Sequence, residues 1–163
     1  MRTLIALVED KPGVLNRVAS LFRRRAFNIE SLTVGHTEKS GVSRMTIVVD
    51  SKQTPVEQVT RNLYKLVNVI RVEDITDEST VMRDLALIKV STEDGTRSEV
   101  MQLVETFRAR VVDVSVDSVM IEVTGTEDKI DGLVEVLDTY GIKELVRTGR
   151  VAMVRGSSNG HSR

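Results

Sequence analysis

The stretch VEDKPGVLNRVASLFRRRAFNIESLTVG, residues 8–35, decides the fold of this chain. It starts at the end of an apolar run of strand length, residues 3–8, and enters a charged turn that Pro12-Gly13 interrupts. Beyond the turn, apolar residues recur at the spacing of a helix that buries one face, namely Val14, Leu15, Val18, Leu21 and Phe22. The stretch therefore predicts a strand, a tight turn and an amphipathic helix in succession.

The residues that follow extend this pattern to a complete unit. Arg23-Arg24-Arg25 closes the helix, where cations interact favourably with the negative end of the helix dipole. Residues 27–35 predict a second strand, and residues 42–50 alternate as a third. Pro55 suits the first turn of a second helix, and residues 69–75 predict a fourth strand. The apolar stripe of the second helix is Val56, Val59, Leu63, Leu66 and Val67.

The second half of the chain repeats this order with little identity. Its predicted strands are residues 84–91, 111–116, 119–123 and 142–147, the last of which residues 151–154 can extend. Asp117-Ser118 joins the middle two as a tight hairpin. One helix starts at about Ser98, and Thr126 is a candidate cap for another that ends at Tyr140-Gly141.

Two consecutive βαββαβ units predict an α+β protein of two tandem ferredoxin-like sandwiches, each with a four-stranded antiparallel sheet and two helices on one face. A polar break after residue 77 separates an N-terminal domain, residues 1–77, from a C-terminal ferredoxin-like domain, residues 82–156. Residues 157–163 form a polar tail that we expect to be mobile. Strands of the first unit are apolar on both faces, so we expect association of copies, with a dimer as the simplest form.

The composition excludes several classes of function. The 163 residues are 40% hydrophobic and 29% charged, with a net charge of -1, which favours neither nucleic acid nor a membrane as partner. The absence of cysteine excludes disulfides, and with two histidines it argues against a structural zinc site. The N-terminal apolar run is too short for a membrane span. We expect a cytoplasmic protein.

No set of residues in the sequence indicates catalysis. His36 lies in a predicted turn and His161 in the tail, and no two carboxylates are paired by the sequence as acid and base. Arg17 with the three arginines at residues 23–25 is the strongest basic cluster. RNA binding by this cluster stays open, but helix capping and solvation explain it better.

The turn at residues 10–13 is the best candidate for a binding site. A helix that starts here presents free backbone N–H groups to an anion, and Gly13 lets a ligand approach the backbone closely. Asp10 offers an acceptor for an ammonium group, and Asn28 offers both a donor and an acceptor. Together these groups suit the backbone of a free amino acid, with an aliphatic side chain received by Val14, Leu15 and Ile29.

The alternative interpretation of this turn is an ordinary connection between a strand and a helix. In that case Asp10 is a helix cap and Asn28 a turn residue. From the residues alone, both interpretations remain open.

The segments DKPGVLNRVASLF, FNIESLTVG and SRMTIVVD together resemble the small, regulatory subunit of acetolactate synthase, also called acetohydroxyacid synthase. The order of elements, with Pro12-Gly13-Val14-Leu15 at the first helix, is similar to an ACT domain, an amino-acid-sensing module. KLVNVIRVEDIT and RDLALIKV also fit, so the resemblance extends to about Gly156.

This resemblance implies that residues 1–77 are an ACT amino-acid-binding regulatory domain. It implies a non-catalytic chain that binds and activates the catalytic subunit and confers feedback inhibition by valine in branched-chain amino acid biosynthesis. Thiamine diphosphate, magnesium and flavin (FAD) would belong to the catalytic subunit, so this chain would carry no cofactor. ACT domains of two chains would pair as a homodimer, with valine at their interface. Asn28 and Gly13 match the family's effector asparagine and helix-start glycine.

One position departs from the family. Several members have Asn where this chain has Asp10, and a carboxylate at that place repels the carboxylate of an effector. Three other hypotheses remain beside the regulatory subunit: a stand-alone ACT-type amino-acid sensor with a different partner protein, a small ferredoxin-like enzyme, and an RNA-binding sandwich.

Overall fold

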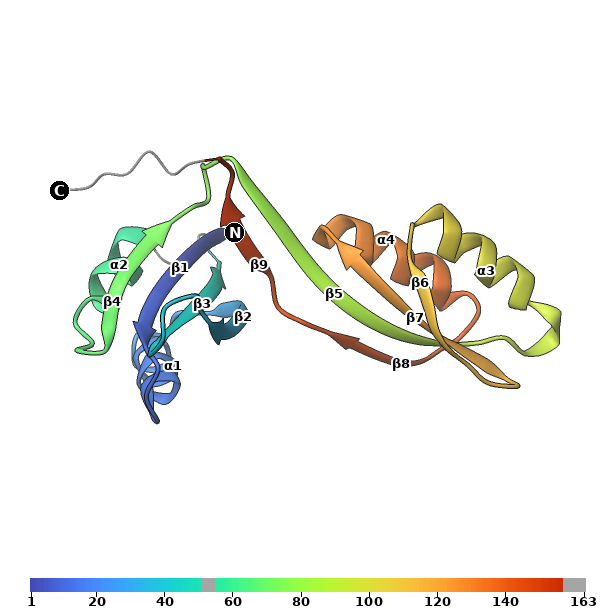
Figure 1. Ribbon diagram of the computed structural model, residues 1–163, viewed down its shortest axis with the longest axis horizontal. Helices are drawn as coiled ribbons and strands as arrows, with labels where there is room; N and C mark the ends of the chain where they lie inside the picture. The colour runs from blue at the N-terminus through green and yellow to red at the C-terminus, as the bar shows by residue number, and fades with distance from the viewer. Residues whose placement is uncertain (51–54, 157–163) are drawn as a thin grey trace. The chain divides into compact units, whose positions relative to one another are not determined.

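The computed structural model describes residues 1–50 and 55–156, which divide into two compact units. The first unit is Met1–Val81 together with the chain from Arg150 onward, and the second is Met82–Gly149. Each unit is a sheet with two helices (Figure 1). The predicted α+β class with tandem ferredoxin-like sandwiches is confirmed.

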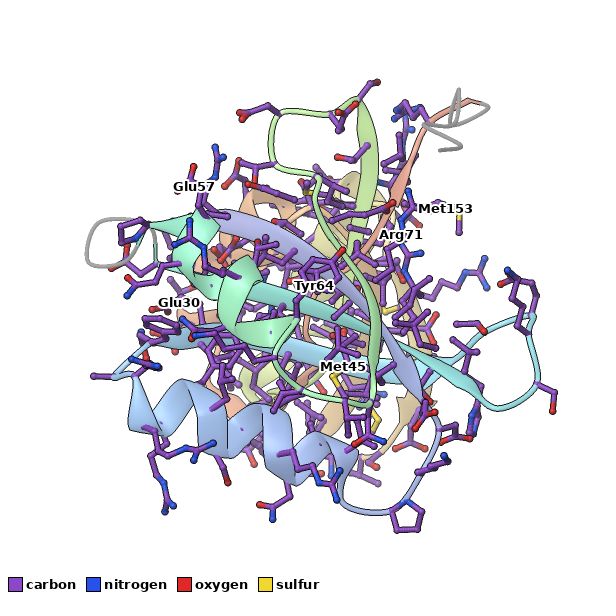
Figure 2. All side chains as sticks on the ribbon, turned by 90° about the vertical axis from the view of Figure 1, so that its left-hand side faces the viewer. Glu30, Met45, Glu57, Tyr64, Arg71 and Met153 are labelled. Carbon is purple, nitrogen blue, oxygen red and sulfur yellow. The ribbon has the colours of Figure 1, made fainter. Side chains whose placement is uncertain are left out.

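The first unit has the predicted order of elements. It comprises β1 (Arg2–Glu9), α1 (Val14–Arg24), β2 (Ile29–His36), β3 (Val42–Val49), α2 (Val56–Leu63) and β4 (Val69–Asp74). The strands lie in the order β2-β3-β1-β4, with antiparallel neighbours, so β2 and β4 are the edges among these four strands. Figure 2 shows α1 and α2 on one face of this sheet.

Alternation along the strands builds the core between this sheet and its helices. The helix-facing side chains of β1 and β3 are at most 1% exposed, namely Leu4, Ala6, Val8, Met45, Ile47 and Val49. Phe22 of α1 packs edge-on against Phe27, with ring centroids 5.9 Å apart. The Tyr64 hydroxyl, at the end of α2, accepts the Val72 N–H of β4 at 3.0 Å (Figure 2).

Two element boundaries in the first unit differ from the prediction by more than one residue. The second strand begins at Ile29 rather than at residue 27, because Ala26 takes a positive φ of 54° and Phe27 turns into the core. The second helix ends at Leu63, so Val67 is 86% exposed and is not part of the buried stripe.

The second unit contains β5 (Thr80–Ser91), the 3-10 turn η1 (Glu93–Gly95), α3 (Arg97–Thr106), β6 (Arg110–Val114), β7 (Ser118–Gly125), α4 (Glu127–Asp138) and β8 (Ile142–Arg147). Its strands run in the order β6-β7-β5-β8, and α3 and α4 share one face (Figure 1). The strand β5 starts earlier than predicted and takes up part of the polar break. Thr126 is the N-cap residue of α4, but its side chain makes no capping hydrogen bond.

The end of the chain differs most from the prediction. Residues 151–154 do not extend β8 but form a separate strand, β9 (Val151–Val154), which pairs with β5. From Arg150 onward the chain groups with the first unit, whereas the predicted C-terminal domain ran to residue 156. Hydrogen bonds to Ser31, Arg44 and Ser79 hold it there. The predicted mobile tail, residues 157–163, lies outside the described residues.

These returning residues help to cover the face of the first sheet that the helices leave open. Ile5, Thr46 and Val48 point away from the helices and are at most 4% exposed. Arg44, on the same face of β3, donates to the Ala152 carbonyl at 2.7 Å, and Ala152 is 6% exposed. We expected a second copy to cover this face of the sheet, but residues of the same chain cover part of it.

Candidate effector site

The turn between β1 and α1 presents an uncapped helix start. Gly13 is the N-cap of α1, with φ 83° and ψ -7°, and no side chain caps the first N–H groups. The first turn of α1 also contains no acidic residue. These N–H groups, at the positive end of the helix dipole, can therefore receive an anion such as a carboxylate.

Gly13 has a conformational reason to be glycine as well as a steric one. Its φ lies in the left-handed region, which L side chains rarely adopt. A Cβ built at Gly13 would meet no atom within 4 Å, so the space beside this backbone is open. The open approach to the Gly13 backbone was predicted from the sequence, but its positive φ was not.

Asn68 holds the turn in place, and the sequence analysis gave it no role. Its side chain donates to Glu9 Oε2 at 2.6 Å and accepts from the Arg17 guanidinium, while its carbonyl accepts the Glu9 N–H at 2.9 Å. The Asn68 amide and then Lys11 lower the pKa of the Glu9 carboxyl below its ordinary value. Asn68 is 7% exposed. The only signal for it was its place in KLVNVIRVEDIT.

Asp10 is paired with a histidine and does not cap the helix. Its Oδ2 lies 3.2 Å from His36 Nδ1, and its N–H donates to the Gly41 carbonyl at 2.8 Å. Both side chains of the pair are well exposed, at 44% for Asp10 and 83% for His36. The alternative interpretation of Asp10 as a helix cap is therefore wrong. His36 is solvent-exposed, as expected, but it lies at the end of β2 and is paired with Asp10.

The three apolar residues of the predicted site differ in exposure. Val14 is 5% exposed and belongs to the core, whereas Leu15 is 46% exposed beside it on α1. Ile29 is partly buried and packs against the core at the start of β2. Leu15 is thus the apolar residue of this turn that is open to a ligand or to a second chain.

Asn28 lies at the other end of β2 from this turn. Ile29 is in register with Val49 and thereby with Arg2, whereas His36 is in register with Ser43 and Val8. The eight residues from Ile29 to His36 span roughly 23 Å of extended chain. Asn28 is exposed, and its amide donates to Glu30. Within one chain, the six predicted residues therefore form two groups, one at each end of β2.

Residues 1–50 and 55–156 contain no group of three or more His, Asp or Glu side chains arranged to hold a metal ion. Over the same residues, every helix is too short or too polar to cross a bilayer.

Comparisons with known proteins place both units in one family. Residues 4–71 match the family model described as the AHAS small subunit-like ACT domain, and residues 83–156 match the small subunit of acetolactate synthase. A probable acetolactate synthase small subunit from Archaeoglobus fulgidus is 58% identical over 155 residues, covering 95% of this chain and 97% of that protein. The acetolactate synthase small subunit of Bacillus subtilis is 52% identical over 159 residues, covering 96% and 92%.

A solved structure agrees with the sequence comparisons. The crystal structure of the acetolactate synthase small subunit from Thermotoga maritima superposes with a TM-score of 0.88 at 40% identity, over 95% of this chain and 97% of that one. The chain therefore belongs to the family of acetolactate synthase small subunits, with that family's ACT domain in residues 4–71 and its C-terminal domain in residues 83–156.

Proposed function

We propose that this chain is the regulatory subunit that binds and activates the catalytic subunit of acetolactate synthase and makes it sensitive to feedback inhibition by valine. The observation that carries this proposal is that the predicted effector residues lie in two groups, one at each end of the edge strand β2. Such groups can form one binding site only if a second copy of the chain brings them together.

A two-fold pairing of β2 with the β2 of a second protomer would join the two groups. If the strands pair antiparallel about a centre near Leu32, residue 28 of one protomer lies opposite residue 36 of its partner. Asn28 would then approach the His36–Asp10 pair of the other protomer, and with it the helix start at Gly13. A homodimer would hold two such sites.

The edge at β2 suits this pairing better than the edge at β4. The side chains of residues 31–35 are uncharged, and Val34 is 42% exposed. β4 instead carries Arg71, Glu73 and Asp74 within its six residues. Charged side chains are a common means of keeping an edge strand from pairing, whereas the middle of β2 carries none.

The chemistry of the joined site fits a small aliphatic amino acid. The effector carboxylate would lie at the N–H groups of α1, with Asn28 as donor and acceptor and Leu15 and Ile29 near the side chain. Asp10 would hold the ammonium group. Because His36 lies beside Asp10, it offsets that negative charge when it is protonated and reduces repulsion of the effector carboxylate.

The rest of the proposal concerns the catalytic subunit. That subunit would hold thiamine diphosphate, magnesium and FAD and perform the chemistry in the cytoplasm, whereas this chain would alter its activity. Valine can regulate only if it binds one arrangement of the ACT dimer better than another.

The proposal is tested by reconstitution. The purified chain is mixed with its catalytic subunit, and acetolactate formation is measured with and without valine. We expect activation by the chain and loss of that activation as valine rises. No activation and no valine effect would exclude this function and favour a sensor that acts on another partner.

Asn28→Ala tests the site itself. We expect it to weaken valine binding by about tenfold, since it removes a hydrogen-bonding group from a ligand of few contacts, while activation persists. Calorimetry on the chain and inhibition curves on the reconstituted enzyme measure the two effects. Gln102→Ala, an exposed amide on α3, is the control. Equal valine binding by Asn28→Ala and parent would remove Asn28 from the site.

A further inference from the structure

The connection between β6 and β7, at one end of the second sheet, displays apolar side chains to solvent (Figure 1). We call residues 114–118 the hairpin tip. Val116 is 97% exposed there, and Val114 is 57% exposed just before it. Turns usually carry glycine, proline, asparagine, aspartate or serine, because these residues suit the turn backbone. A fully exposed valine in the hairpin tip therefore needs a reason beyond the turn itself.

The backbone of the hairpin tip is held from outside the hairpin. The Arg97 guanidinium, at the start of α3, donates to the Ser115 carbonyl at 2.5 Å and to the Val116 carbonyl at 2.8 Å. The Thr92 N–H donates to the Asp117 carbonyl at 2.9 Å. Consecutive carbonyls of the tip are thereby fixed by α3 and by the residue that follows β5. The exposed valine is consequently presented on a defined backbone rather than on a loose loop.

The charged groups beside the hairpin tip are paired within the chain. The Lys143 Nζ, in β8, lies 2.5 Å from Asp117 Oδ2 and 3.8 Å from Glu93 Oε1. The hydrogen bond between Lys143 and Asp117 raises the pKa of the lysine and lowers the pKa of the aspartate. Because these charges already have counter-ions, a partner surface at the tip need not supply any. An apolar pocket is therefore the surface that complements the exposed valines.

β6 is an edge strand, but it is poorly suited to pairing with a further strand. It has five residues, two of which are Arg110 and Asp113, and its register with β7 shifts between Val111 and Asp113. Short length, charges and bulges are common means of keeping an edge strand from pairing. A second copy of the chain is therefore not expected to add its own strand to this edge. Contact through the exposed side chains of Val114 and Val116 is the mode of association that remains.

We propose that the hairpin tip is a docking element that inserts Val116, with Val114 beside it, into an apolar pocket of the catalytic subunit. The identity of the partner rests on the proposed function. A hairpin tip that is already held by Arg97 loses little conformational freedom on binding, so more of the gain from burying the valine appears as affinity. The β2 edge of the first unit stays available for the proposed homodimer.

Val116→Ser tests the contact itself. Serine removes the apolar group but is a residue that turns favour, so the urea midpoint of the variant should equal that of the parent. The catalytic subunit is titrated with each chain, and the affinity is measured by calorimetry. We expect Val116→Ser to weaken binding by about tenfold or more, the loss expected when one valine is no longer buried. The control is Val67→Ser, because Val67 is 86% exposed but belongs to the first unit.

Arg97→Gln tests whether the fixed backbone matters. It removes the guanidinium from the Ser115 and Val116 carbonyls and leaves the valine in place. We expect binding to weaken by about threefold or more, because the tip must then be ordered on binding. If Arg97 acts only by positioning Val116, the double variant Arg97→Gln with Val116→Ser should bind as Val116→Ser alone does. No loss from Arg97→Gln, or equal losses in both backgrounds, would overturn this positioning role.

The outcomes separate this inference from the proposed function. If the parent chain does not bind the catalytic subunit, both fail. If the parent, Val67→Ser and Val116→Ser bind equally well, the hairpin tip is excluded as a contact while the proposed function stands. Weaker binding by Val67→Ser together with unchanged binding by Val116→Ser would move the contact to the first unit.

Discussion

Gly13 combines two requirements at the scale of a single residue: a left-handed backbone and open space above it. We predict that Gly13→Ala lowers the free energy of unfolding by about 1–2 kcal/mol, because an L side chain there adopts a disfavoured φ. Urea denaturation measures the change.

A second glycine provides a control for which we expect the opposite change in stability. Gly132 lies within α4, and a Cβ there would meet Phe107 Cε1 at 3.6 Å, an ordinary contact. Gly132→Ala should therefore raise stability by about 0.5–1 kcal/mol. A Gly13→Ala protein as stable as the parent would show that the turn can relax to another conformation.

Glu9 gives a pH-dependent prediction at the same scale. Asn68 and Lys11 lower the pKa of Glu9 in the folded chain below the ordinary value of 4.5. The ionised carboxylate therefore stabilises the fold above about pH 4.5, and this contribution is lost as pH falls through the lower, folded pKa.

Asn68→Ala should raise the pKa of Glu9 towards 4.5, as followed by NMR titration of its side-chain carboxyl. Glu9→Gln should make the urea midpoint less dependent on pH in the acid range. A Glu9 pKa that does not move in Asn68→Ala would mean that the Asn68 amide is not the cause of the lowered pKa.

At the scale of elements, Arg147 joins β8 to β5 and α4. Its guanidinium contacts Asp84 Oδ2 at 3.0 Å and Asp131 Oδ1 at 2.6 Å, and the Asp84 side chain is only 9% exposed. Arg147→Met should cost about 2–3 kcal/mol of stability, because it leaves a nearly buried carboxylate without its cation.

The double variant Arg147→Met with Asp84→Leu should recover most of that loss, since no unpaired buried charge then remains. Urea unfolding of both single variants and the double variant gives the coupling energy. If Arg147→Met has the same free energy of unfolding as the parent, water stabilises the Asp84 carboxylate as well as Arg147 does.

At the scale of the whole molecule, the proposed dimer would form through the edge strand β2. In the antiparallel pairing centred near Leu32, Val34 lies opposite Glu30 of the partner protomer, so Val34→Asp sets like charges against each other. We predict that Val34→Asp gives the monomer mass in analytical ultracentrifugation.

Ile70→Asp is the matched control, since Ile70 is a 52% exposed apolar residue on the other edge strand, β4. It should leave the dimer intact. Dissociation by Ile70→Asp together with a dimeric Val34→Asp would move the interface to β4.

Periodicity was enough to predict the order of elements, because strands and helices of a half-buried sheet are encoded by local spacing of apolar residues. The alternation in β3 appears as predicted, and in α1 every residue of the predicted stripe except Leu15 is buried. Residues 151–154 form a separate strand because they pair with β5, which lies far along the chain. The local spacing of apolar residues cannot predict such a pairing.

The sequence by itself determined the two βαββαβ units, the helix start at Gly13 and the family. Only the tertiary structure decided that Asn28 and Gly13 lie at opposite ends of β2, that no side chain caps the helix start, and that Asn68 holds the turn. It also decided that residues 150–156 return to the first unit. The physical reason is that strand register and long-range hydrogen bonds join residues many positions apart, while composition and periodicity record only neighbours.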